Sequence, residues 1–211
     1  MRRIPLLSYI KKLDRPLFTT FELAAVSGKS PSVVIQSLNY LCKNGLVLKL
    51  RRGIWAEAGH PSLSPYAVIP YLFGCRRTYV SFLSALHLYD IIEQIPQNIM
   101  LASTGHTRSI RTKLGIFSIH QISAGFFKGF GWYKNRGEFL IAEPEKALVD
   151  CLYLSVRKKR QFGHFPELHF SNAFSFNKAR RWAQEIPDKK MRIPVLRKLE
   201  AIRAAHLGNG H

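Results

Sequence analysis

Residues 18–55 read FTTFELAAVSGKSPSVVIQSLNYLCKNGLVLKLRRGIW and carry the strongest structural signals of the sequence. Thr19 and Glu22 have the spacing of a capping box, in which each side chain bonds the free backbone amide of the other residue. A helix is therefore predicted to begin at this point. Gly28 is expected to end it, because glycine tolerates the left-handed conformation of a helix C-terminus.

A second helix is predicted to follow at once. Ser30 suits the N-cap position, Pro31 suits the first helical position, and Gly45 is expected to close the helix. Its predicted inward face carries apolar residues at helical spacing, namely Val34, Ile35, Leu38, Leu41 and Cys42. Because only residues 28–30 separate the two helices, the pattern indicates a helix-turn-helix.

The opposite face of the second helix and the turn before it carry side chains that suit contact with DNA: Lys29, Ser30, Ser32, Val33, Gln36, Tyr40 and Lys43. Glutamine can bond an adenine edge through two hydrogen bonds, and valine can contact a thymine methyl group. Lysine can neutralise phosphates. We expect sequence specificity to depend on Gln36, Ser32 and Tyr40. The alternative is an ordinary solvated helix face.

A basic-tipped hairpin is predicted directly after this helix. Residues 46–50 and 54–56 are short apolar runs that flank Arg51, Arg52 and Gly53, as in two strands joined by a turn. A helix-turn-helix followed by such a hairpin is typical of a winged helix. Arg51 and Arg52 would then lie on the wing, where they could reach phosphates or the minor groove, and Lys49 could add a phosphate contact.

The rest of the chain predicts a second domain of mixed structure. We expect a winged helix-turn-helix domain over residues 1–60, whose first helix spans residues 4–13, and a C-terminal α+β domain over residues 61–211. Helices are predicted near residues 65–73, 79–92 and 142–153. Short β-branched and aromatic runs predict strands of a small, mostly antiparallel sheet at residues 98–103, 117–122, 126–133 and 138–142, with a basic loop at residues 105–111. From about residue 176, two basic amphipathic helices are expected near residues 177–186 and 190–207.

The formal net charge is +19 over 211 residues. Residues 1–60 carry 10 Lys and Arg against 3 Asp and Glu, residues 61–155 carry 9 against 6, and residues 156–211 carry 13 against 4. The basic charge therefore gathers at both ends of the chain. Such a field attracts polyanions, and nucleic acid is the partner that we expect. A merely solvated basic surface is the alternative.

Several classes of protein do not fit the sequence. No apolar run has the length of about 18 residues that a membrane span needs, and the N-terminal residues lack the pattern of a signal peptide. Three cysteines that are far apart, at positions 42, 75 and 151, argue against a disulfide framework and a cysteine zinc site. We expect a soluble cytoplasmic protein with no membrane partner.

No catalytic motif stands out. On a helix beginning near residue 143, Glu143 and Glu145 do not share a face and Asp150 lies more than a turn away, so these acids suit the helix dipole better than a metal. The eight histidines form no metal-binding motif, and there is no glycine-rich phosphate loop or nucleophile elbow. We therefore expect no enzymatic activity, cofactor or metal. One alternative is an enzyme acting on nucleic acid with these carboxylates around a metal, and another is an RNA-binding or toxin-neutralising module built on the basic C-terminal helices.

The sequence resembles the AbiEi-type antitoxins, the transcriptional-regulator halves of AbiE abortive-infection toxin–antitoxin systems. The resemblance rests on residues 18–55, on the serine–serine–alanine–leucine pattern of residues 81–86, and on AEPEKALVD at residues 142–150. It covers most of residues 17–153.

This resemblance implies an N-terminal winged helix that represses the promoter of its own operon. The recognition helix would be Ser32 to Lys43, with Arg51 and Arg52 on the wing. It also implies a genetic partner, a nucleotidyltransferase-type toxin, with which the antitoxin forms no stable complex, as in type IV systems. In this family the motif from Glu143 to Asp150 looks structural rather than catalytic, and the C-terminal domain is needed for antitoxin activity.

Overall fold

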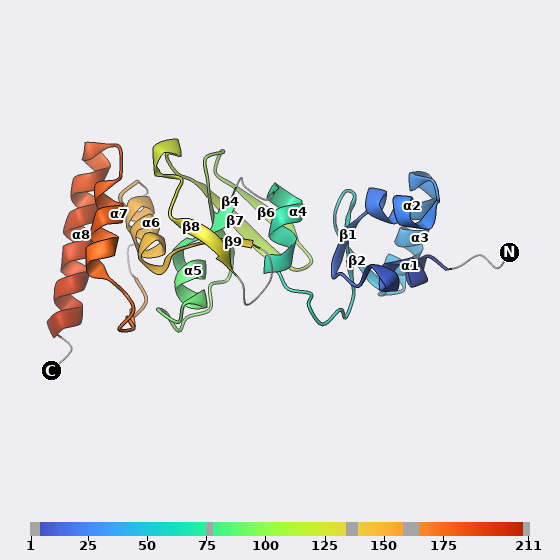
Figure 1. Cartoon of the computed structure of the whole chain (residues 1–211), viewed down its shortest axis with the longest axis horizontal. Coiled ribbons are helices and arrows are strands. Elements are labelled where there is room, and N and C mark those ends of the chain that lie inside the picture. Colours follow the sequence, from blue (N-terminus) through green and yellow to red (C-terminus); the bar gives the residue numbers. More distant parts are fainter. Residues whose placement is uncertain (1–4, 75–77, 134–138, 158–164, 209–211) are drawn as a thin grey trace. The chain divides into compact units, whose positions relative to one another are not determined.

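The structure is a computed structural model that describes residues 5–74, 78–133, 139–157 and 165–208. It divides into two compact units, the first made mainly of residues up to Leu72 and the second mainly of residues from Phe73 onward (Figure 1). The chain is α+β, with a small sheet in the first unit and a larger one in the second. Within the described residues, no helix combines the length with the apolar character that crossing a bilayer requires.

In its described residues up to Glu57, the first unit combines three helices with a three-stranded antiparallel sheet of order β1-β3-β2. Its elements are α1 (Leu6–Leu13), β1 (Leu17–Thr19), α2 (Thr20–Ser27), α3 (Pro31–Lys43), β2 (Val47–Arg51) and β3 (Ile54–Glu57). The predicted helices and hairpin are confirmed, although Ile4 lies outside the described residues. Strand β1 is an addition to the prediction: it pairs with β3 and leads directly into α2.

The core of the first unit gathers around Trp55 and Phe18, both of which are almost completely buried. The indole nitrogen of Trp55 donates to Thr20 Oγ1 at 3.0 Å, which satisfies its one polar group and ties β3 to the start of α2. Apolar side chains from all three helices and the sheet complete this core: Leu6, Ile10, Leu23, Ala24, Val34, Leu38, Leu41 and Val47.

The second unit is organised around a six-stranded sheet of order β6-β7-β5-β4-β9-β8. Its strands are β4 (Thr78–Val80), β5 (Ile99–Ser103), β6 (Arg108–Thr112), β7 (Gly115–Gln121), β8 (Phe130–Tyr133) and β9 (Phe139–Ala142). Its helices are α5 (Phe82–Leu88), α6 (Pro144–Arg157), α7 (Phe176–Gln184) and α8 (Lys189–Gly208), with a short turn η2 (Ala124–Phe126). In the sequence, η1 (Tyr66–Val68) and α4 (Ile69–Phe73) follow β3 and precede β4, and they confirm the helix predicted near residues 65–73.

The prediction that the strands of this sheet are mostly antiparallel is wrong. Strand β4 pairs antiparallel with β5 but parallel with β9, and β5 pairs parallel with β7, so the sheet is mixed. Parallel neighbours need long crossover connections, and a run of β-branched residues does not reveal which strands such a connection joins. The predicted strand at residues 138–142 begins at Phe139 in the structure, and residue 138 lies outside the described residues.

Two further predictions in this region are corrected. The single helix expected over residues 79–92 is a strand, β4, followed by the shorter helix α5, with Ser81 between them. The basic loop expected at residues 105–111 contains the edge strand β6, whose charged, exposed side chains are typical of a sheet edge that resists further pairing. Both errors arise because three to five residues are too few to establish a period.

Helix α6 is the most buried helix of the second unit. It packs against α5 on one side and against α7 and α8 on the other (Figure 1). Continuous burial from Glu145 to Ser155 follows from this double packing, and it includes three charged residues. The two C-terminal helices confirm the predictions near residues 177–186 and 190–207.

Candidate nucleic-acid interface

Helix α3 begins and ends where its sequence predicts. Gly28 adopts φ +65°, which turns the chain between α2 and α3. Ser30 occupies the N-cap position with Pro31 after it, but the Ser30 hydroxyl lies 3.1 Å from the Ser32 hydroxyl and makes no capping bond. Gly45 adopts φ +72° just beyond the C-terminus. Local sequence thus fixes the length of α3 and the sharp turn before it.

The two faces of α3 divide as predicted, with one exception. Val34, Leu38 and Leu41 are buried against the core, whereas Ile35, expected to be buried with them, is 42 % exposed. Ile35 lies at the margin of the apolar stripe, and the neighbouring elements do not extend far enough to cover it. The outward residues Ser32, Val33, Gln36, Tyr40 and Lys43 are all exposed, while Lys29 in the turn is half-buried.

Sequence reasoning missed Asn39 on this outward face. Asn39 is exposed and follows Gln36 by three residues, so the two amides lie on neighbouring turns of the same face. The helical spacing that selected Gln36 and Lys43 contained this signal. The outward face is thus richer in amide groups than predicted.

The hairpin of β2 and β3 presents its basic residues to solvent. Gly53 adopts φ +77° in the turn, and the register shifts between Lys49 and Arg51. Arg51 and Arg52 are exposed at this tip. Lys49 is exposed too, and its ammonium lies 5.3 Å from the centre of the Trp55 ring, a cation–π contact that orients it.

The two glutamates that the structure describes in the first unit pair with other bases, and Asp14 lies 4.0 Å from His60. Glu57 pairs with Lys11, and Glu22 lies 3.3 Å from the Arg15 guanidinium. Among the described residues, the five candidate bases have no ion pair: Lys29, Lys43, Lys49, Arg51 and Arg52. Their positive charge is therefore available to an external anion.

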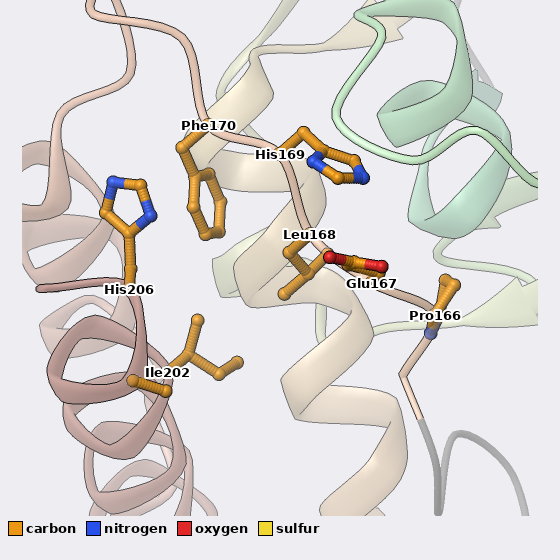
Figure 2. Close-up of a pocket in the computed structure, with 8 residues that line it drawn as sticks. Pro166, Glu167, Leu168, His169, Phe170, Ile202 and His206 are labelled. Atoms are coloured by element: carbon orange, nitrogen blue, oxygen red, sulfur yellow. The ribbon is translucent and has the colours of Figure 1, made fainter. Parts of the chain in front are cut away.

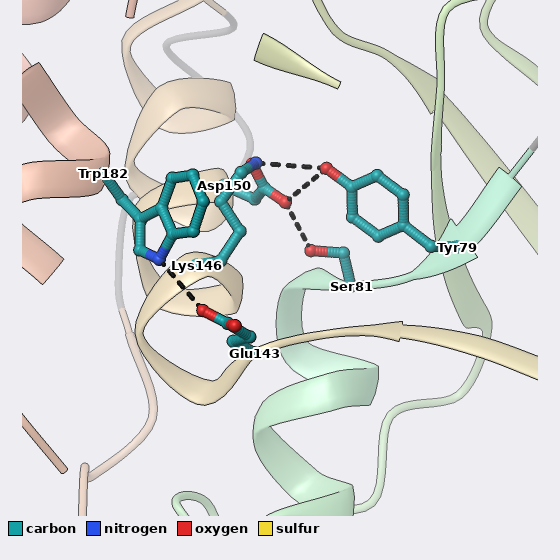
Figure 3. A network of polar contacts seen from close by, with 6 residues as sticks. All are labelled: Tyr79, Ser81, Glu143, Lys146, Asp150 and Trp182. Carbon is teal, nitrogen blue, oxygen red and sulfur yellow. Dashed lines mark hydrogen bonds and ion pairs between the residues drawn. The ribbon is translucent and has the colours of Figure 1, made fainter. Parts of the chain in front are cut away.

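The second unit contains a buried polar network that sequence reasoning did not predict (Figure 3). Lys146 and Asp150 form an ion pair one turn apart on α6, and both side chains are fully buried. The other Asp150 oxygen accepts hydrogen bonds from the Tyr79 hydroxyl at 3.0 Å and the Ser81 hydroxyl at 2.7 Å. The Lys146 ammonium also donates to the Tyr79 hydroxyl at 3.1 Å. The pair therefore connects α6 to β4 and to the turn before α5.

The surroundings of this network are apolar and aromatic. The Lys146 ammonium lies 3.7 Å from the centre of the Phe126 ring. Burial lowers the pKa of Lys146, and the Asp150 carboxylate opposes that shift. Burial and the same carboxylate raise the pKa of Tyr79 well above its ordinary value. Phe82, directly after Ser81, has φ +57°, a strained conformation that marks the tight turn from β4 into α5.

The two glutamates at the start of α6 pair with residues of α7 and with the residue that caps it. Glu143 accepts a hydrogen bond from the Trp182 indole at 3.2 Å (Figure 3). The Lys178 ammonium lies 3.2 Å from both Glu143 and Glu145. Glu145 also accepts from the backbone amide of Ser175 at 3.1 Å. Within the described ranges, no group of three His, Cys, Asp or Glu residues could hold a metal ion. The three carboxylates of the motif therefore all engage partners within the chain.

An open cavity of about 450 Å³ lies between the extended segment of residues 166–170 and helix α8 (Figure 2). The backbone amide of His169 donates to the backbone oxygen of Ile91 at 2.8 Å, which connects this segment to the loop after α5. The rings of Phe170 and His206 meet edge to face, with their centres 5.2 Å apart. These contacts account for the cavity as the space left where an extended segment crosses a helix.

The comparisons with known proteins add no assignment: neither the protein-family models nor the curated protein sequences give a match to this chain. The function of this protein is therefore inferred from its own residues and their geometry.

Proposed function

We propose that this protein is a sequence-specific double-stranded DNA-binding repressor whose first unit acts as a winged helix-turn-helix. Helix α3 would enter the major groove and present Ser32, Gln36 and Tyr40 to the bases. Arg51 and Arg52 on the hairpin would contact phosphates or the minor groove. The observation that carries the proposal is the exposed outward face of α3 beside bases that form no ion pair with any acidic residue in the described ranges.

The resemblance to AbiEi-type antitoxins extends this proposal to regulation. On that basis the protein represses its own promoter and is the antitoxin of an AbiE-like type IV toxin–antitoxin system. Its genetic partner would be a nucleotidyltransferase-type toxin that it does not bind stably. The buried positions of Lys146 and Asp150 support a structural rather than catalytic role for the motif from Glu143 to Asp150.

Fluorescence anisotropy with the full chain tests the proposal. The probes are the duplex upstream of this protein's own gene, a scrambled duplex and a matched RNA, each measured over a range of salt concentrations. We expect the upstream duplex to bind more tightly than the other two at every salt concentration. Equal binding to all three, lost as salt rises, would mean that the net charge merely attracts polyanions, and tighter binding of RNA would favour the RNA-binding alternative.

A further inference from the structure

Helix α3 has an outward face that carries amide groups and a valine but no arginine. We propose that this face selects A·T base pairs, with Gln36 and Asn39 bonding adenine and Val33 contacting the methyl group of thymine. The proposal rests on the proposed DNA binding and deepens it, because it names the base pairs that the site takes.

The geometry of α3 places the two amides together. Ser32, Gln36, Asn39 and Lys43 follow one another by four, three and four residues, which on an α-helix is a single stripe. All four side chains are exposed, and the stripe lies opposite the buried residues of α3. Within the described part of the chain, the side-chain amides of Gln36 and Asn39 make no hydrogen bond. Both are therefore free to bond an external partner.

The chemistry of these amides favours adenine. A primary amide offers one donor and one acceptor side by side, which match N7 and the N6 amino group of adenine in the major groove. Guanine presents two acceptors in the major groove. Its usual partner is arginine, which donates to both acceptors, or lysine. Helix α3 has no arginine, and its single lysine, Lys43, is at the C-terminal end, whereas recognition helices contact bases mainly through their N-terminal residues.

Val33 supplies the matching contact for thymine. Its side chain is 46 % exposed, although an apolar side chain gains nothing from contact with water. It precedes Gln36 by three residues, so the two side chains lie on adjacent turns. A valine at this position fits the C5-methyl group of the thymine that pairs with, or neighbours, the adenine bonded by Gln36.

The hairpin is consistent with the same preference. Narrow minor grooves in A·T-rich DNA carry an enhanced negative potential that attracts arginine. Arg51 and Arg52 are exposed at the hairpin tip and have no acidic partner among the described residues. An A·T-rich site would thus suit both the helix and the hairpin.

Selection from a pool of randomised duplexes, with the full chain as bait, tests this inference. We expect the bound sequences to converge on a site with A·T pairs at two or more adjacent positions. Replacing adenine in that site with 7-deazaadenine removes the N7 acceptor and should weaken binding by about 5-fold to 100-fold at a contacted position. Replacing thymine with uracil removes one methyl group and should weaken binding about fourfold.

Variants connect each effect to its side chain. The 7-deazaadenine effect should shrink in Gln36→Ala or Asn39→Ala, and the uracil effect should disappear in Val33→Ala. Gln184→Ala, which removes an exposed glutamine at the end of α7, is the matched control and should retain both effects.

The possible outcomes distinguish failure of the A·T preference from failure of the proposed DNA binding. Convergence on G·C pairs, or on a site whose affinity is indifferent to both base analogues, overturns the A·T preference while duplex binding stands. A pool that never converges, although every duplex is bound, overturns it as well. Failure to bind any duplex overturns the proposed function itself.

Discussion

Asp150 is the residue whose loss should damage the fold most directly. Replacing it with alanine leaves the Lys146 ammonium buried without its counter-ion and removes the acceptor for Tyr79 and Ser81. Breaking a buried pair from one side costs about 3–5 kcal/mol. We expect Asp150→Ala to lower the free energy of unfolding of the second unit by this amount, measured by urea denaturation.

The double variant Lys146→Met with Asp150→Leu is the control. It removes both charges together, so no unpaired charge remains, and exchanging a buried ion pair for apolar residues is often neutral. We expect it to recover much of the stability lost by Asp150→Ala. If the double variant were as unstable as the single one, the lost hydrogen bonds of Tyr79 and Ser81 rather than charge balance would explain the loss.

Gly129 is a second sensitive residue, because Trp182 of α7 packs directly on it. A Cβ atom at Gly129 would lie 2.7 Å from the Trp182 ring, and its φ of +76° already strains any other residue. We expect Gly129→Ala to lower the melting temperature of the second unit by several degrees, which corresponds to about 1–3 kcal/mol. Gly131→Ala is the matched control, since a Cβ atom there meets nothing within 4 Å. Equal melting temperatures for the two variants would contradict this packing.

At the scale of the element, α2 depends on the capping box at its N-terminus. The Thr19 hydroxyl accepts from the Glu22 amide at 3.1 Å, and a Glu22 carboxylate oxygen accepts from the Thr19 amide at 2.6 Å. Removing an N-cap side chain costs about 1 kcal/mol. We expect Thr19→Ala to raise the hydrogen-exchange rates of the α2 amides about fivefold, while Ser27→Ala at the opposite end changes the first turn little.

The same box makes the start of α2 sensitive to acid. Burial alone would raise the pKa of Glu22, but the hydrogen bonds from Thr19 and the nearby Arg15 outweigh it and lower that pKa below 4.5. Because the folded-state pKa is the lower one, the stabilisation from Glu22 is present at a pH above the unfolded-state pKa and is lost as the pH falls through the folded-state pKa. Amide exchange in α2 should show this loss in the natural chain, and Glu22→Gln should abolish the part that depends on pH.

At the scale of the whole molecule, the charge of +19 should make any DNA binding strongly dependent on salt. We expect Arg52→Ala to weaken binding to specific and scrambled duplexes alike, and to reduce the slope of log K against log salt by about 1. Arg15→Ala removes the same charge from a residue already paired with Glu22 and should change the slope less. Identical slopes for the two variants would place the phosphates away from the hairpin.

Much of the candidate interface was predictable because its signals are local. The capping box of Thr19 and Glu22, the turn at Gly28 and the helix start at Pro31 depend on residues within four positions of one another. Exposure of Gln36 and Tyr40 follows from the helical period. Ile35 shows the limit of that reasoning, because its exposure depends on how far the neighbouring elements extend over α3.

By itself, the sequence determined the helices and hairpin of the first unit, the basic charge and the two C-terminal helices. Only the tertiary structure decided the mixed order of the large sheet and the burial of Lys146 with Asp150. Tyr79 meets these two residues across 67 and 71 positions of the chain, respectively. Local propensity and period carry no information over such separations. The choice of partners there depends on which packing satisfies every buried charge and hydrogen bond at once.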